Sequence, residues 1–283
     1  MKILLTGSDG QLGLCFQDRM PATWQILPTD SAQLDITSQE KVLSCVRDFC
    51  PDIIVNAAAY TAVDKAESES ELAALVNVKG PENLALAAKE VGAVLFHVST
   101  DYVFDGSGKT PYLETDATNP LSIYGQTKLN GERAVFDILP AAVVIRTAWV
   151  FSEYGNNFVK TMLRLSDNFE ELRIIDDQRG CPTYAGDIAQ AIITMIDNKP
   201  LGGLYNFCGD KEVSWYEFAK KIFEKAYEHG KIRAIPGMKA IGTSDYPTAA
   251  IRPMYSTLNG NKIQNLGIKL SDWESALSVI FIR

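Results

Sequence analysis

Three glycines near the start of the chain constrain its fold more than any other feature. Gly7, Gly10 and Gly13 follow a short apolar run at residues 3–6 and precede a helical stretch at residues 11–20. Glycine suits a sharp turn between strand and helix, and it lets the backbone approach a phosphate group closely. In this context the spacing G-x-x-G-x-x-G predicts a dinucleotide-binding loop, with a turn that binds no ligand as the alternative.

Short apolar runs rich in Val and Ile alternate with helical stretches along the chain. Strands are expected at residues 3–6, 24–27, 52–56, 93–99, 142–146, 172–176 and 204–207. Helices are expected at residues 11–20, 37–50, 67–91 (broken near residues 80–81), 122–138, 187–197 and 214–228. This alternation predicts an α/β fold with a doubly wound parallel sheet of Rossmann type.

Two helix starts carry a capping-box sequence. At residues 37–40, Thr37 is the expected N-cap and Glu40 its partner three positions later. Residues 271–274 repeat the pattern, with Ser271 as the expected N-cap.

The length of 283 residues suits one large or two modest domains. We expect an NAD(P)-binding Rossmann domain at residues 1–147 plus about 184–207. A smaller, interleaved α/β substrate-binding domain is then expected at about residues 148–183 and 208–283.

Composition argues against several classes of protein. A net charge of −8 argues against nucleic acid and against an anionic membrane surface as partners. No apolar run reaches the roughly 18 residues of a membrane span, and the early glycines argue against a signal peptide. Five cysteines without a C-x-x-C pair indicate reduced thiols and a cytoplasmic location. The two histidines, His97 and His229, are too few for a His-rich metal site, and His97 is expected in the core.

A second group of residues indicates a type of reaction. Thr100 follows a predicted buried strand, and Tyr124 and Lys128 lie four residues apart, on one face of the next helix. Such a trio can protonate a carbonyl oxygen while a nicotinamide delivers a hydride to its carbon. The nearby cation is expected to lower the pKa of the tyrosine from about 10 toward neutrality. A surface pair at i and i+4 is the alternative, which the glycine loop and Thr100 disfavour.

Asp30 suggests which cofactor is used. It ends the second predicted strand about 20 residues beyond the glycine loop, where a carboxylate binds the adenosine ribose. Residues 31–33 contain no Lys or Arg to meet a 2′-phosphate. We therefore expect NADH or NADPH, with NADH at least as good.

Longer segments resemble a known family. Residues 7–13, 56–67 and 99–106, together with Tyr124-x-x-x-Lys128, are similar to the extended short-chain dehydrogenase/reductases. Within them the similarity is to the dTDP-4-dehydrorhamnose reductases. It continues nearly to the end of the chain, through residues 146–151, 155–158, 177–183 and 252–253.

The resemblance implies reduction of the C4 keto group of a dTDP-sugar, dTDP-4-dehydro-6-deoxy-L-mannose, to dTDP-L-rhamnose. It gives Tyr124 the role of proton donor, Lys128 a place on the nicotinamide ribose, and Thr100 a hydrogen bond to the reacting oxygen. With the glycine loop it implies a cofactor site of Gly7, Gly10, Gln11, Leu12, Gly13, Asp30, Asp35, Ile36, Ala59, Tyr60, Thr61, Tyr124 and Lys128. The implied substrate site contains Thr100, Tyr102, Trp149, Asn157 and Arg252.

Departures from the family pattern narrow the function. Relatives that dehydrate nucleotide sugars carry an Asp-Glu pair after the threonine, whereas Asp101 is followed here by Tyr102, which favours simple reduction. A nucleotide-sugar epimerase and a non-catalytic regulatory subunit remain the alternatives. Some reductases of the family pair through a metal bridged by glutamates. Cys15 and Gly186 stand at those positions here, so we expect no metal and a monomer or weak dimer.

Four other side chains have both a functional and a structural interpretation. Arg252 is expected at the substrate diphosphate, with a structural ion pair as its alternative. Trp215 and Trp273 are expected to pack between helices rather than to stack on a ligand. Inert packing is favoured over a reactive thiol for Cys181.

Overall fold

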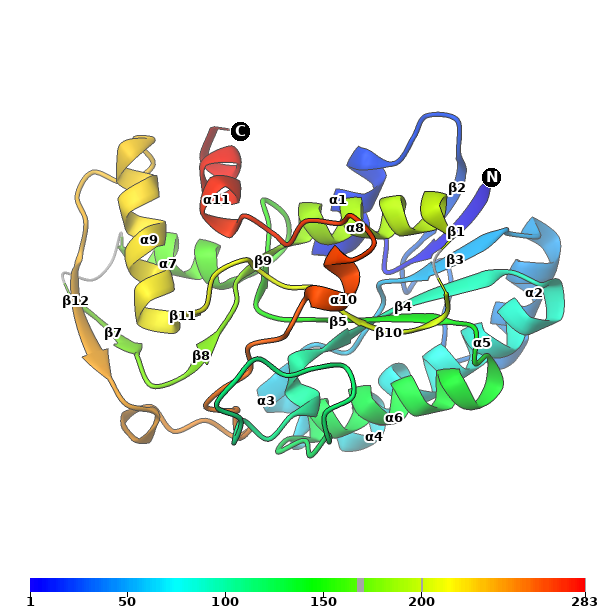
Figure 1. Cartoon of the computed structure of the whole chain (residues 1–283), viewed down its shortest axis with the longest axis horizontal. Helices are drawn as coiled ribbons and strands as arrows, with labels where there is room; N and C mark the ends of the chain where they lie inside the picture. The colour runs from blue at the N-terminus through cyan, green and yellow to red at the C-terminus, as the bar shows by residue number, and fades with distance from the viewer. Residues whose placement is uncertain (167–170, 200, 283) are drawn as a thin grey trace.

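The computed structural model describes residues 1–166, 171–199 and 201–282. Within this part of the chain, six parallel strands form a sheet in the order β10-β5-β4-β3-β1-β2 (Figure 1). The strands are β1 (Lys2–Thr6), β2 (Gln25–Thr29), β3 (Ile53–Asn56), β4 (Val94–Thr100), β5 (Val143–Thr147) and β10 (Gly203–Asn206). The predicted doubly wound α/β fold is confirmed, and the strand near residue 204 joins the main sheet.

Helices cover both faces of this sheet (Figure 1). On one face lie α1 (Gln11–Arg19) and α8 (Ala185–Asn198), packed on Ile3 and Leu5 of β1. On the other lie α2 (Gln39–Phe49), α5 (Gly80–Val91) and α6 (Ile123–Ile138). Side chains alternate along a strand, so Leu4 faces this second layer while its neighbours face the first. Burial on both faces explains the continuous apolar runs in the sequence.

A smaller group of elements lies to one side of the sheet (Figure 1). Short sheets pair β12 with β7, β6 with β9 and β11 with β8. The elements are β6 (Val150–Phe151), α7 (Phe158–Ser166), β7 (Glu171–Ile175), β8 (Arg179–Gly180), β9 (Thr183–Tyr184), β11 (Val213–Ser214), α9 (Trp215–Glu228), β12 (Gly237–Ile241) and α11 (Trp273–Ile282). Phe218, Phe223 and Trp273 belong to their shared apolar core. The domain boundaries given above stay a prediction.

The capping box expected at Thr37 is wrong by one residue. Ser38 is the N-cap of α2, and its hydroxyl accepts the backbone N–H of Lys41 at 3.4 Å. The Thr37 hydroxyl donates instead to Asp35 Oδ1 at 2.6 Å. The side chain that the pattern assigned to the helix cap therefore bonds to a carboxylate two residues earlier in the chain.

The cap expected at Ser271 is wrong for a similar reason. The Ser271 hydroxyl donates to Asp187 Oδ2 at 2.6 Å and so belongs to the contact with α8. Asp272 accepts the backbone N–H of Ser275 at 3.2 Å and caps α11 in its place.

The helical segment at residues 67–91 is not broken at its proline. Instead α4 (Ser70–Ala74), a π-helical turn (Leu75–Lys79) and α5 run on continuously, while a separate short helix, α3 (Val63–Ala66), precedes them. Pro81 has no N–H to donate to the Asn77 carbonyl four residues earlier. The π-helical turn accommodates this missing hydrogen bond, so that the helix continues through the proline. A Cβ atom at Gly131 of α6 would overlap that carbonyl, so glycine there lets α6 pack against the turn.

Candidate functional site

A cleft of about 780 Å3 lies at the carboxyl ends of the central strands. Chain connections diverge between β1 and β3, which is where open α/β sheets bind ligands. Of the residues expected in the site, the cleft is lined by Gly7, Gly10, Gln11, Leu12, Asp30, Asp35, Ile36, Ala59, Thr61, Thr100, Tyr102, Tyr124, Lys128 and Trp149. The fold thus brings most of the predicted cofactor residues and several of the predicted substrate residues into one cavity.

The glycine loop closes tightly around the end of β1. Gly7 has φ of +67°, and a Cβ atom there would lie 2.6 Å from the Ala58 nitrogen. A Cβ atom at Gly13 would overlap the Gly7 carbonyl, so this glycine lets α1 approach the strand. Gly10 is the N-cap of α1, and among the described residues no side chain caps this helix and no acid lies in its first turn. Free N–H groups at a helix N-terminus suit an anion, so the loop fits a dinucleotide pyrophosphate.

Two carboxylates lie at the far end of the cleft. Asp30 Oδ1 accepts the backbone N–H groups of Ala32 and Gln33, both at 2.9 Å. The hydrogen bond from the Thr37 hydroxyl is the main cause that lowers the pKa of Asp35. This end of the cleft is therefore anionic, and it offers acceptors to ribose hydroxyls.

Tyr124 and Lys128 project from the first two turns of α6, whose N-cap is Ser122. Lys128 is 2% exposed, and its Nζ donates to the Val98 carbonyl at 2.7 Å. Burial lowers the pKa of Lys128 to about 8, against the opposing effect of Glu132.

The expectation that Lys128 lowers the pKa of the tyrosine is wrong for this structure. Burial raises the pKa of Tyr124 to about 12, although its hydroxyl shares a hydrogen bond with that of Thr100. The ammonium group of Lys128 is directed to a backbone carbonyl, whereas burial and the carboxylate of Asp101 both raise the pKa of the phenol. The phenol is therefore protonated at neutral pH.

Thr100 is held at the end of β4 by its neighbours. Its Oγ1 donates to Asp101 Oδ1 at 3.0 Å and accepts the backbone N–H of Tyr102 at 3.2 Å. Asp101 is 1% exposed, and burial raises its pKa to about 6. The Tyr102 ring meets that of Tyr124 edge-on, with centroids 5.6 Å apart. These contacts fix the hydroxyl and the phenol on one wall of the cleft.

Arg252 forms the ion pair that was its structural alternative. Its two terminal nitrogens donate to Asp64, at 3.1 and 2.7 Å. It also donates to the hydroxyl of Tyr102, which lines the cleft. A contact of Arg252 with substrate stays a prediction.

Two predicted site residues are directed elsewhere. Asn157 Nδ2 donates to Gln11 Oε1 at 2.9 Å and to the Ser152 carbonyl at 2.8 Å. The Asn157 amide thus braces the loop, and the neighbouring Asn156 lines the cleft. The Tyr60 hydroxyl donates to Glu69 at 2.6 Å. Contacts of Asn157 with substrate and of Tyr60 with cofactor stay predictions.

A buried polar network beneath the site was not predicted. Glu132 follows Lys128 by one helical turn and accepts two hydrogen bonds from Arg146, at 2.9 and 2.7 Å. The hydroxyl of Ser99 also donates to Glu132. Tyr124, Lys128 and Glu132 are spaced by four residues, and this spacing was the signal available in the sequence.

The expectation for Trp215 is wrong in part. Its indole lines the cleft and stacks on that of Trp149, with centroids 3.5 Å apart and planes at 6°. Trp273 is 1% exposed and packs edge-on against Phe218, as expected of a packing residue. Helical periodicity predicted a packing role for both tryptophans. It cannot distinguish a side chain packed between helices from one that lines a cleft.

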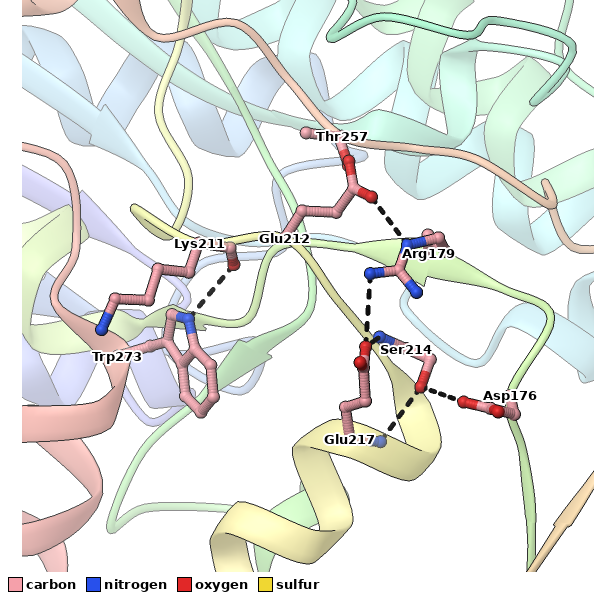
Figure 2. A network of polar contacts seen from close by, with 8 residues as sticks. All are labelled: Asp176, Arg179, Lys211, Glu212, Ser214, Glu217, Thr257 and Trp273. Carbon is pink, nitrogen blue, oxygen red and sulfur yellow. Dashed lines mark hydrogen bonds and ion pairs between the residues drawn. The ribbon is translucent and has the colours of Figure 1, made fainter.

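Figure 2 shows the polar contacts that fix the N-terminus of α9, where Trp215 is the first residue. The Ser214 hydroxyl accepts the backbone N–H of Glu217 at 3.0 Å and donates to Asp176. Arg179 of β8 pairs with Glu217 at 3.3 Å and with Glu212 at 2.7 Å. The helix start is thereby tied to the neighbouring strands.

Other predictions concern side chains outside the cleft. His97 is fully buried, and its Nδ1 lies 2.9 Å from Asn56 Nδ2, so the core assignment is confirmed. Cys181 is 3% exposed within an apolar cluster. In the described part of the chain, no helix has the length and apolarity to cross a membrane. The same residues contain no group of three or more His, Cys, Asp or Glu placed to hold a metal.

Comparison with known proteins gives consistent matches over the whole chain. The family described as RmlD substrate binding domain matches residues 1–282. A dTDP-4-dehydrorhamnose reductase of Aggregatibacter actinomycetemcomitans is 45% identical over 99% of this chain and 98% of that protein. The structure of such a reductase from Clostridium acetobutylicum is 39% identical, with a TM-score of 0.94 and coverage of 100% and 99%. One from Bacillus anthracis, in complex with NADP, is 38% identical, with a TM-score of 0.94 and coverage of 99% and 98%.

The raised pKa of Asp101 predicts a pH-dependent free energy of unfolding. The folded protein keeps this proton up to about pH 6, whereas the ordinary value is 3.8. The folded state therefore binds more protons between these values, so the contribution of Asp101 to stability falls as pH rises from about 4 to 6. Urea unfolding should give free energies of unfolding for wild type and Asp101→Asn. The difference between these two free energies should change with pH across this range and be constant above it.

The control for this prediction is Gln190→Ala, at an exposed position on α8. Its difference from wild type in free energy of unfolding should not vary with pH, because no titratable group is changed. A difference for Asp101→Asn that is equally constant would contradict the buried carboxyl.

Proposed function

This chain belongs to the RmlD substrate binding domain family, the family of the dTDP-4-dehydrorhamnose reductases, and is an oxidoreductase. We propose that it carries out NAD(P)H-dependent reduction of the C4 keto group of dTDP-4-dehydro-6-deoxy-L-mannose to dTDP-L-rhamnose. The observation that carries this proposal is the presence of Thr100, Tyr124 and Lys128 in one cleft with the uncapped N-terminus of α1.

Residues along the cleft would supply contacts to a dinucleotide. Gly7 and Gly13 let the loop and α1 close tightly against the end of β1, so that free N–H groups of α1 would meet the pyrophosphate. Asp30 would accept hydrogen bonds from the adenosine ribose, and Lys128 would donate to the nicotinamide ribose. When bound, the reduced nicotinamide supplies a hydride to the carbonyl carbon.

Tyr124 is proposed as the proton donor to the carbonyl oxygen. Its phenol is protonated at neutral pH, since burial raises its pKa to about 12. The Thr100 hydroxyl, which donates to Asp101 in this structure, would turn to donate to the same oxygen as negative charge develops there. The buried ammonium of Lys128 would stabilise the phenolate that the transfer leaves behind.

Removing the phenolic hydroxyl should separate catalysis from binding. Tyr124→Phe is expected to lower kcat by about 10²–10⁴, the usual contribution of general acid catalysis. Its cofactor affinity should stay within about twofold of wild type, because the ring remains. Lys128→Met should impair both kcat and cofactor binding. The measurement is cofactor oxidation with the 4-keto sugar nucleotide, with product identification.

Tyr227→Phe on the exposed face of α9 is the matched control and should match wild type. A Tyr124→Phe protein with wild-type turnover would exclude this residue as the acid. Conversion without net cofactor oxidation would instead indicate an epimerase. Tight cofactor binding with no conversion of any 4-keto sugar nucleotide would indicate the regulatory subunit.

The cofactor preference is a second prediction. We expect kcat/KM with NADH to equal or exceed that with NADPH, because Asp30 would repel a 2′-phosphate. The nearby Lys41 lies 3.9 Å from Asp35, which already offsets its charge. Asp30→Asn should shift the ratio toward NADPH. The Bacillus anthracis relative was solved with NADP, and a preference of more than tenfold for NADPH here would refute the argument.

We also propose a metal-independent reaction by a monomer or weak dimer. Burial raises the pKa of Cys15 to about 12, so this thiol stays protonated and is a poor ligand. The guanidinium of Arg19 occupies the space that a side chain at Gly186 would need. Light scattering and activity should therefore be the same with and without EDTA. Dissociation or inactivation on chelation would show that other carboxylates bind a bridging metal.

A further inference from the structure

Two stacked indoles form part of the cleft wall, and proton and hydride transfer do not require them. Trp149 follows β5 and lines the same cleft as Thr100 and Tyr124. Trp215 begins α9, 66 positions later in the sequence, and its ring lies parallel to that of Trp149 at 3.5 Å. The pair therefore joins the strand ends to the smaller group of elements.

Trp149 is held in an unusual conformation. Its φ is +48°, a left-handed value that is unfavourable for a side chain of this size. A Cβ atom at Gly180 of β8 would lie only 2.7 Å from Trp149 Cε2, so a side chain at position 180 would displace the indole. Backbone strain of this kind persists where the surroundings determine it, and it concentrates at ligand sites.

Trp215 is in turn fixed from three sides. Its Nε1 donates to Gln178 Oε1 at 3.2 Å, and the Phe158 ring lies 4.6 Å away. The contacts around Ser214 and Arg179 in Figure 2 hold the start of α9, on which Trp215 lies. Trp215 is thus a rigid support behind one face of Trp149.

We propose that Trp215 is a specificity-determining residue, which fixes Trp149 so that the two indoles present an apolar wall to the carbon-5 substituent of the sugar. The proposal rests on the proposed function, which supplies a sugar nucleotide as ligand. The wall suits the methyl group of a 6-deoxy sugar. A hydroxyl at carbon 6 would lose water against the indole rings without gaining a partner from Trp215, whose Nε1 already donates to Gln178.

Binding of three ligands tests this proposal. Isothermal titration calorimetry compares dTDP-L-rhamnose, dTDP-L-mannose (the same sugar with a hydroxyl at carbon 6) and dTDP. Wild type should bind the 6-deoxy sugar about 10- to 100-fold more tightly than its 6-hydroxy counterpart, the range of apolar-pocket discrimination. Trp215→Ala should reduce this ratio at least about fivefold and leave dTDP affinity within about twofold.

A second variant changes Trp149 without touching the stacking partner. Gly180→Ala places a methyl group against the Trp149 indole and should reduce the same ratio. In steady-state kinetics both variants should raise KM for the 4-keto substrate while kcat stays within about threefold, because no proton-transfer group is altered. If Trp215→Ala does not fold, Trp215→Phe and Gly180→Ala decide the question.

The matched control is Trp24→Phe, which removes an indole outside the cleft lining. It should change neither the ratio of affinities for dTDP-L-rhamnose and dTDP-L-mannose nor the KM for the 4-keto substrate. Far-ultraviolet circular dichroism should show an exciton signal from the stacked pair in wild type and Trp24→Phe, and none in Trp215→Phe.

The inference would be overturned if both Trp215→Ala and Gly180→Ala discriminated between dTDP-L-rhamnose and dTDP-L-mannose as strongly as the wild type does. A loss of dTDP affinity as large as that of dTDP-L-rhamnose would also overturn it, because it would indicate a merely structural role. Failure of the proposed function is distinguishable, because the wild type would then oxidise no NADH or NADPH with the 4-keto sugar nucleotide, whatever its affinity for the three ligands.

Discussion

A buried ion pair between Glu132 of α6 and Arg146 of β5 connects the helix of the proposed proton donor to the central sheet. Both side chains are 4% exposed, and both carboxylate oxygens accept hydrogen bonds from the guanidinium. Ser99, at the end of β4, donates to the same carboxylate. Removing one partner of such a pair costs about 3–5 kcal/mol, because a charge is left buried and uncompensated. This contact fixes the position of α6 relative to the ends of β4 and β5. The geometry of the cleft therefore depends on it.

Contacts across the cleft come from residues that the sequence motifs contain but that do not themselves face the ligand. Asn157 donates to Gln11 of the glycine loop at 2.9 Å, and so ties the loop after β6 to the start of α1. Asp64, from the segment after β3, holds Arg252, which reaches the cleft through the Tyr102 hydroxyl. Motif residues of this kind position the cleft, which explains why the family resemblance extends far beyond the residues that line it.

Most of the fold could be predicted because buried parallel strands leave continuous Val- and Ile-rich runs in the sequence. The errors have both local and tertiary causes. Thr37 and Ser271 match an N-cap, but Thr37 donates to the neighbouring Asp35, and Ser271 donates to Asp187 of α8. Trp215 has the spacing of a packing residue, yet its helix begins at the edge of the cleft. The pKa of Tyr124 depends on burial, which spacing along a helix does not reveal.

Charge balance beneath the cleft links this packing to the proposed chemistry. Glu132 pairs with Arg146 and also favours the ammonium form of Lys128, whose pKa burial lowers to about 8. The buried Asp101 acts in the opposite sense on the site, because it adds to the effect of burial, which raises the pKa of the Tyr124 phenol. If Tyr124 donates the proton as proposed, Glu132 would serve twice, since it fixes α6 through Arg146 and favours the cation that a phenolate at Tyr124 would need.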